Sequence, residues 1–264
     1  MPVEIKTAVC GDIEMKYCTF GGGEKDFIIL PGLSILSVML SADAIAEAYA
    51  SFGEKYKIWV FDRRENVPEK YSVADMAKDT ALIMKELGIS DAYIFGASQG
   101  GMMAQVIAIE YPELVNRLML ASSVSRVGSF ESDYVWNNWM KLAESRKIHE
   151  LNLDFCEKIY TPELFEQFKD AIVGMESAIT EENIKKFLIL AKGTEYFDVY
   201  DRLELIQCPV LILGSKKDAV LQVKNMEETA EALGCEIYLY DEYSHAVYDE
   251  APDFKERLLE FCDR

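Results

Sequence analysis

Six short, nearly continuous apolar segments are the feature of this 264-residue sequence that most limits how it can fold. A strand that is apolar on both faces belongs in a sheet that is covered on both sides, and segments with helical periodicity lie between most of these runs. The pattern predicts an α/β fold with a mostly parallel sheet and helices on both faces. The segments are DFIIL, KIWVFD, DAYIFG, RLMLAS, PVLILG and EIYLYD.

The beginning of the chain has a different pattern. EIKTAV and EMKYCTF flank Gly11 and Asp12, a combination that is typical of a β-hairpin. The hairpin would add two antiparallel strands at one edge and bring the expected sheet to eight strands. The expected helices of this core cover Ser37–Phe52, Val73–Leu87, Gln99–Tyr111, Gln222–Leu233 and Pro252–Cys262.

A long segment between RLMLAS and PVLILG interrupts the alternation of strands and helices. It contains four amphipathic pieces, YVWNNWMKLAES, LNLDFCEKIY, PELFEQFKDAIVG and EENIKKFLILAKG, and it is too long for a simple connection. We expect a helical cap inserted after strand 6. The expected division is a core domain of residues 1–122 and 201–264 and a cap of residues 123–200.

Charge and composition limit the kinds of partner. Lys and Arg number 27 and Asp and Glu number 46, so the net charge is −19, which repels phosphate backbones and anionic lipid. We therefore expect a small-molecule substrate, no nucleic-acid or membrane partner, and either a monomer or a homodimer. No export signal is apparent at the N-terminus, and the six cysteines form no CxxC pair, which predicts a cytoplasmic protein with reduced thiols. No cluster has metal-ligand spacing, so neither a metal nor an organic cofactor is expected.

The stretch YIFGASQGGMMAQ contains Ser98 between Gly96 and Gly100, on an expected turn from a strand into a helix. This is the context of a nucleophile elbow, in which a sharp turn lifts the serine hydroxyl clear of the sheet. Residues on the two sides of the serine crowd one another in such a turn, which explains the glycines. A glycine-rich turn with an incidental serine is the competing interpretation. The sequence has neither GxGxxG nor GK[ST] here, which disfavours a nucleotide-binding loop.

A serine nucleophile needs a base, and the chain has two histidines, His149 and His245. His149 lies in a charged, helix-like stretch, where a half-exposed surface residue is the better interpretation. His245 follows the last expected strand, at the sheet edge where α/β proteins build their sites. We therefore predict His245 as the base.

The base in turn needs a carboxylate that fixes its orientation and stabilises its charged form. Asp218 follows the strand PVLILG, and the chain order Ser98, Asp218, His245 is the order of nucleophile-elbow hydrolases. A turn or helix-capping aspartate is the ordinary alternative for Asp218. Asp241, Glu242 and Asp249 are nearby alternatives for the acid.

Two backbone N–H groups are candidates for an oxyanion hole. The N–H of Gln99 begins the helix after Ser98, and the loop after FIILPG offers the N–H of Leu33 or, as the second choice, Gly32. A plain strand-ending turn would explain this loop equally well if it stood alone.

With these elements in place, the sequence resembles the α/β-hydrolase superfamily over nearly its whole length. The resemblance is carried by FIILPGLS, VFDRRE, the block from YSVADM to LMLASS, CPVLILGSKKD and SHAVYDEAPDF. It is most similar to small capped hydrolases that include enol-lactonases, carboxylesterases and C–C bond hydrolases. The sequence departs from the family pattern at Glu65, where glycine is usual, at Pro31-Gly32, where His-Gly is frequent, and in the residues before His245.

The resemblance implies a serine hydrolase that acts on an ester, lactone or thioester through an acyl-enzyme. C–C bond hydrolysis, cofactor-free peroxidase or lyase chemistry and a ligand-sensing receptor are the alternatives on the same fold. The aromatic side chains of the expected cap suggest an apolar substrate group, although they could equally form the core of the cap. The candidate substrate-binding residues are Trp136, Trp139 and Met140.

Overall fold

The computed structural model describes residues 2–264, and its centre is an eight-stranded sheet in the order β1-β2-β4-β3-β5-β6-β7-β8. From β4 through to β8 the neighbouring strands run parallel, whereas β1 and β2 pair antiparallel at one edge. The predicted α/β fold, with its N-terminal hairpin and eight strands, is therefore confirmed. The strands are β1 (Ile5–Cys10), β2 (Ile13–Phe20), β3 (Lys25–Leu30), β4 (Tyr56–Arg64), β5 (Ala92–Ala97), β6 (Val115–Ala121), β7 (Val210–Ser215) and β8 (Glu236–Tyr240).

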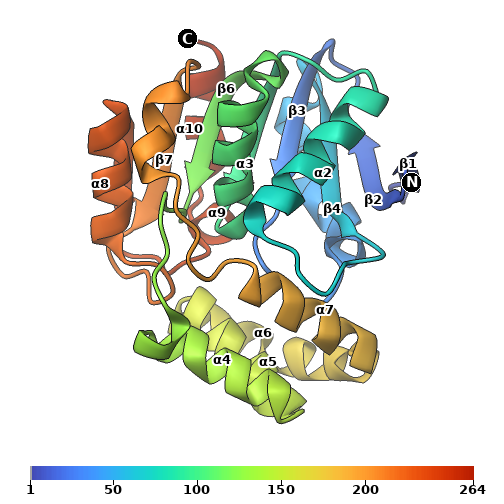
Figure 1. Cartoon of the computed structure of the whole chain (residues 1–264), viewed down its shortest axis with the longest axis vertical. Helices are drawn as coiled ribbons and strands as arrows, with labels where there is room; N and C mark the ends of the chain where they lie inside the picture. Colours follow the sequence, from blue (N-terminus) through green and yellow to red (C-terminus); the bar gives the residue numbers. More distant parts are fainter. Residues whose placement is uncertain (1) are drawn as a thin grey trace.

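Alternate residues of the strands pack into two separate cores, one on each face of the sheet. In β3, Ile28 and Leu30 belong to one core and Phe27 and Ile29 to the other. Helices α2, α3 and α8 cover the first face (Figure 1), and residues of α1 and α10 pack into the core of the second. These helices are α1 (Ala42–Ala48), α2 (Val73–Glu86), α3 (Gln99–Glu110), α8 (Val223–Leu233) and α10 (Phe254–Cys262).

The expectation of one continuous helix over Ser37–Phe52 is wrong. The segment consists of the 3-10 turn η1 (Val38–Ser41), the short helix α1, and a second 3-10 turn, η2 (Ala50–Phe52). The ring of Phe52 packs 4.9 Å from that of Phe27, which lies on the second face of the sheet. Tertiary packing of the aromatic rings therefore overrides the local helical pattern.

The four amphipathic pieces of the long insertion form helices that lie together at the carboxyl end of the parallel strands (Figure 1). We call them the helical layer. Thr161 and Thr180 begin two of them, each accepting a backbone hydrogen bond through its hydroxyl. The N–H of Ala246, beside His245, donates to Ile159 O at 2.8 Å and joins the layer to the sheet. The helices are α4 (Tyr134–Glu144), α5 (Ile148–Ile159), α6 (Pro162–Gly174) and α7 (Glu181–Lys192).

The remaining short elements connect these parts. They are η3 (Pro112–Leu114), η4 (Phe130–Ser132), η5 (Met175–Ala178), η6 (Tyr200–Leu205) and α9 (Val247–Glu250). Within residues 2–264, no helix combines the length and the apolar character needed to cross a membrane.

Replacing Phe27 by alanine tests the second core. Phe27 is fully buried, and its ring lies 4.9 Å from Phe52 and 5.6 Å from Tyr56. We expect Phe27→Ala to lower the free energy of unfolding by about 3–5 kcal/mol, because it removes a large ring from a packed core. Urea unfolding followed by circular dichroism measures the change. Leu40→Ala is the control, since Leu40 is 64% exposed; equal losses for the two variants would contradict this description of the core.

Candidate active site

Ser98 lies in the turn between β5 and α3 with φ 51° and ψ −120°, a positive-φ conformation that non-glycine residues rarely adopt. The turn is closed so tightly that its glycines have no room for a side chain. A Cβ on Gly96 would lie 2.5 Å from Gly100 O, and a Cβ on Gly100 would lie 2.0 Å from Leu30 O. This is the strained strand-to-helix turn that the sequence predicts.

His245 and Asp218 form a buried hydrogen-bonded pair beyond the ends of β8 and β7. The distance from Nδ1 of His245 to Oδ2 of Asp218 is 2.8 Å, and their side chains are 3% and 0% exposed. The other carboxylate oxygen of Asp218 accepts from the N–H groups of Val220 and Leu221 at 2.8 and 2.9 Å. A carboxylate on Nδ1 holds the proton there, so Nε2 of the neutral ring is free to accept a proton.

Ser98 and His245 line the same small chamber, which has a volume of about 20 Å³. This is room for about one water molecule. Gly32 and Leu33 form another part of the wall, and the helical layer closes the chamber. The other lining residues are Trp136, Trp139, Phe155, Ile159, Val220 and Tyr248.

Met140 does not line this chamber, although its neighbour Trp139 does. Helix periodicity alone does not exclude it, because Met140 lies one turn after Trp136, which does line the chamber. Met140 is instead half-buried against the hydrophobic core.

Backbone N–H groups suitable for an oxyanion hole are available beside Ser98. Gln99 is the first residue of α3, so its N–H has no acceptor within the helix. In the loop after β3, the N–H groups of Gly32 and Leu33 have no hydrogen-bond acceptor within residues 2–264. Leu33 and Gly32 therefore both remain candidates for the second donor.

The other candidate polar residues lie away from the chamber. His149 is exposed, with Nδ1 3.0 Å from Oε1 of Glu176. Asp241 forms an exposed ion pair with Lys216 at 2.7 Å. The chamber's lining also includes neither Glu242, which is exposed, nor Asp249, whose Oδ2 lies 3.5 Å from the hydroxyl of Tyr160.

Three buried serines at strand ends hold the loops of the site, and the sequence reasoning missed them. Ser122 donates to His245 O at 2.5 Å, and Ser123 donates to Ser98 O at 2.9 Å. Ser215 donates to Tyr243 O, two residues before His245. The signal was present in the sequence, because small hydroxyl residues follow the apolar runs RLMLA and VLILG.

Apart from His245 and Tyr248, the residues that line the chamber have no ionisable side chain. Burial, reinforced by the neighbouring Asp249 carboxylate, raises the pKa of the Tyr248 phenol well above its usual value, so it stays neutral. In the part of the chain that the structure describes, no group of three or more His, Cys, Asp or Glu side chains is arranged to hold a metal ion.

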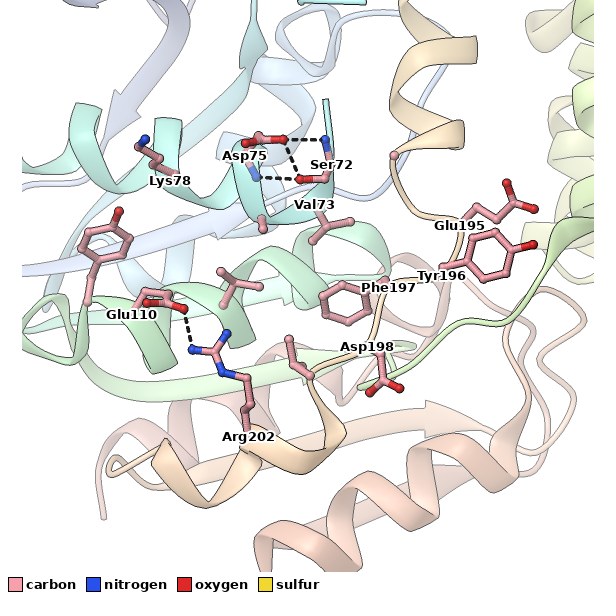
Figure 2. Close-up of a pocket in the computed structure, with 15 residues that line it drawn as sticks. Ser72, Val73, Asp75, Lys78, Glu110, Glu195, Tyr196, Phe197, Asp198 and Arg202 are labelled. Atoms are coloured by element: carbon pink, nitrogen blue, oxygen red, sulfur yellow. Dashed lines mark hydrogen bonds and ion pairs between the residues drawn. The ribbon is translucent and has the colours of Figure 1, made fainter. Parts of the chain in front are cut away.

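A larger cavity of about 560 Å³ lies between α2, α3 and residues 193–202 (Figure 2). Its wall mixes apolar and polar side chains and contains the ion pair of Arg202 with Glu110 at 2.5 Å. The hydroxyl of Ser72 and the carboxylate of Asp75 bond to each other in the N-terminal cap of α2, as Figure 2 shows. Neither Ser98 nor His245 lines this cavity, so cavity size does not identify the candidate active site.

The parallel sheet, the strained serine turn and the buried histidine–aspartate pair at its carboxyl edge define a class of enzyme, the α/β-hydrolases. A family model described as alpha/beta hydrolase fold matches residues 47–153. The RutD protein of Serratia proteamaculans, whose name describes a carbamate hydrolase, is 31% identical over 205 residues, which are 69% of this chain and 71% of that protein. The chain belongs to the α/β-hydrolase family, and it is a hydrolase.

Other relatives cover more of the chain at lower identity. The 3-oxoadipate enol-lactonase 2 of Acinetobacter baylyi is 21% identical over 251 residues, which are 93% of this chain and 91% of that enzyme. The crystal structure of an enol-lactonase from Burkholderia xenovorans LB400 has a TM-score of 0.85 at 17% identity and covers 98% of this chain and 100% of its own. This structural likeness supports the fold across the whole chain, including the helical layer.

Adding a methyl group at Gly100 tests the geometry of the turn. The new Cβ would lie 2.0 Å from Leu30 O and 2.5 Å from Pro31 O, so the backbone must move. We expect Gly100→Ala to abolish activity and to lower the free energy of unfolding by about 1–3 kcal/mol or more, as overpacking does. Thermal unfolding and an ester assay measure the two effects. Gly174→Ala is the matched control, because nothing lies within 4 Å of its Cβ position; the same losses there would contradict this account of the turn.

Proposed function

We propose that this hydrolase is a serine hydrolase with Ser98 as nucleophile, His245 as base and Asp218 as the acid that orients the base. The observation that carries the proposal is the His245–Asp218 hydrogen bond of 2.8 Å beside the chamber that Ser98 also lines. The strained conformation of Ser98 supports it, because such strain persists where the surrounding structure holds a functional group in position.

The proposed reaction is acyl transfer to Ser98 and then to water. Nε2 of His245 takes the hydroxyl proton as Oγ of Ser98 attacks the substrate carbonyl, and the same nitrogen then protonates the leaving oxygen or sulfur. A water molecule, deprotonated by His245, releases the acyl group in the second half. The N–H of Gln99 and that of Leu33 or Gly32 stabilise the oxyanion, and each such donor contributes about 10²–10³ in kcat.

The substrate that we propose is a small ester, lactone or thioester with an apolar group near the reacting carbonyl. The chamber is narrow, and Trp136 and Trp139 cover it from the helical layer. We propose that residues 123–200 form a cap over a core of residues 1–122 and 201–264, and that these tryptophans bind substrate. Because the relatives described above are named as an enol-lactonase and a carbamate hydrolase, lactones and carbamates should be tested together with esters.

Labelling with a fluorophosphonate probe, together with turnover of short and medium p-nitrophenyl esters and a lactone panel, tests the proposed nucleophile. We expect wild-type protein to be labelled and to turn over short esters, and Ser98→Ala to lose both. Absence of labelling, or labelling that survives Ser98→Ala, would contradict the proposal. Labelling without turnover of any compound would favour a ligand sensor.

The two histidines offer a matched pair of variants. We expect His245→Ala to lower kcat by about 10³-fold or more, because the proton acceptor is lost, and His149→Ala to stay close to wild type. Steady-state kinetics with p-nitrophenyl acetate measure both. The assignment of the base is wrong if His149→Ala is the inactive variant.

Adjacent residues of α4 test the proposed cap. Trp139 lines the chamber and is 2% exposed, whereas Met140 does not line it. We expect Trp139→Ala to move the preference toward longer acyl chains, since it enlarges the chamber, and Met140→Ala to leave it unchanged. The ratio of kcat/KM for the octanoate and acetate esters is the measurement. If this ratio is unchanged in Trp139→Ala, the acyl group does not bind against Trp139.

A further inference from the structure

Arg63 is a buried cation that has no carboxylate partner in the part of the chain that the structure describes. Its side chain is almost fully buried, and no Asp or Glu oxygen lies within 4.0 Å of its guanidinium nitrogens among residues 2–264. Its neighbour Arg64 is also buried, at 7% exposure, but pairs with Asp79 and with the exposed Asp12, each at 3.1 Å. Burying an unpaired charge is costly, so the position of Arg63 needs a reason.

The hydrogen bonds of Arg63 lead to both halves of the proposed oxyanion hole. Its Nη2 donates to Pro31 O at 2.8 Å and to the side-chain Oε1 of Gln99 at 3.0 Å. Pro31 begins the loop that carries the N–H groups of Gly32 and Leu33. Gln99 carries the other N–H. One guanidinium nitrogen therefore links the two backbone segments that must stay at a fixed separation.

The hydrogen bond from Arg63 to Pro31 O also affects how strongly the loop can donate a hydrogen bond. The carbonyl of Pro31 and the N–H of Gly32 belong to the same peptide group. A cation that donates to the carbonyl oxygen polarises that group and makes its N–H a stronger donor. Burial lowers the pKa of the Arg63 guanidinium, and the charge of Asp62 opposes that effect; arginine nevertheless stays protonated in proteins.

The Gln99 side chain is held on its other side by the helical layer. Its Nε2 donates to Leu190 O at 2.9 Å and to the hydroxyl of Thr194 at 2.7 Å, at the carboxyl end of α7. With Arg63 on its oxygen, the amide is fixed at both ends, so the start of α3 has little freedom to move. The chain of bonds thus runs from the loop after β3, through Arg63 and Gln99, to the layer that covers the chamber.

An irregularity in β4 accompanies the placement of Arg63. Met15 of β2 pairs with Arg64, and Tyr17 pairs with Phe61, so Asp62 and Arg63 together stand opposite a single residue, Lys16. An extra residue of this kind is a β-bulge, and bulges beside active sites redirect a side chain. Because of the bulge, two neighbouring arginines point in different directions. Arg64 reaches Asp79, and Arg63 reaches Gln99 in the turn after Ser98.

We propose that Arg63 is a positioning residue of the oxyanion hole, which fixes the N–H of Gln99 relative to the loop of Gly32 and Leu33 and strengthens the Gly32 donor. The proposal rests on the proposed function, because it assumes that these N–H groups receive an oxyanion. Arg63 acts through them and does not itself line the Ser98 chamber.

The test compares Arg63→Met and Arg63→Lys with the control Arg64→Lys, which alters the neighbouring buried arginine that has carboxylate partners. Each protein is titrated with the fluorophosphonate probe, so that kcat is expressed per reactive Ser98 and misfolded protein is not counted. The affinity for butylboronic acid, which forms a tetrahedral adduct on the serine, is measured beside kcat and KM for p-nitrophenyl acetate.

We expect Arg63→Met to lower kcat per reactive site about 10- to 100-fold, with KM within about threefold of wild type. This fall in kcat is no larger than the fall caused by removing one hydrogen-bond donor of an oxyanion hole. The affinity for the boronic acid should fall in parallel with kcat. Arg63→Lys should lie between Arg63→Met and wild type, since an ammonium can still donate to one of the two acceptors. Arg64→Lys should keep the wild-type kcat per site.

Gln99→Met provides a second route if Arg63→Met does not fold, because it removes the side-chain link and keeps the backbone N–H. It should show the same fall in kcat and in boronic acid affinity. If the unmodified protein hydrolyses esters and either Arg63→Met or Gln99→Met has an unchanged kcat per reactive site, the proposed role of Arg63 is wrong, whereas the proposed function stands. A wild-type protein that is neither labelled nor active would overturn the proposed function and this inference together.

Discussion

The close packing of the start of α3 against the end of β3 is the constraint on which the rest of the candidate site depends. A side chain on Gly100 would overlap the carbonyl oxygens of Leu30 and Pro31, so the two backbones touch directly. That contact brings the start of α3 beside the loop after β3, where a Cβ on Gly32 would lie 3.2 Å from the Cβ of Ser98. The proposed chemistry needs these groups within one hydrogen bond of a single carbonyl, and backbone contact is a rigid way to hold them there.

The strand ends hold the remaining parts of the site through hydroxyl groups. Ser122, Ser123 and Ser215 each donate to a backbone carbonyl in a neighbouring loop, and all three are buried. Loops at a sheet edge carry many unpaired backbone groups, and buried ones must find partners. These serines meet that requirement and fix the segments that carry Ser98 and His245.

Much of this arrangement could be predicted because its signals are local. Apolar runs predict the strands, and the carboxyl ends of parallel strands meet at one edge, so Ser98, Asp218 and His245 could be assigned to one region from their order. The Ser37–Phe52 segment and Met140 could not be predicted in this way. Each depends on which neighbour a side chain meets in space, as Phe52 meets Phe27. The proposed role of Arg63 was similarly hidden, since it depends on a bulge that only strand pairing reveals.

The bond from Ala246 N to Ile159 O has a consequence for how a substrate enters. The chamber beside Ser98 has room for about one water molecule, and α4 and α5 supply four of its lining residues, Trp136, Trp139, Phe155 and Ile159. Ile159 is the last residue of α5, and its bonded partner is the residue next to His245. A shift of α5 that keeps this bond would therefore move the segment that carries His245. The proposed cap and the proposed base would then be linked through this one backbone hydrogen bond.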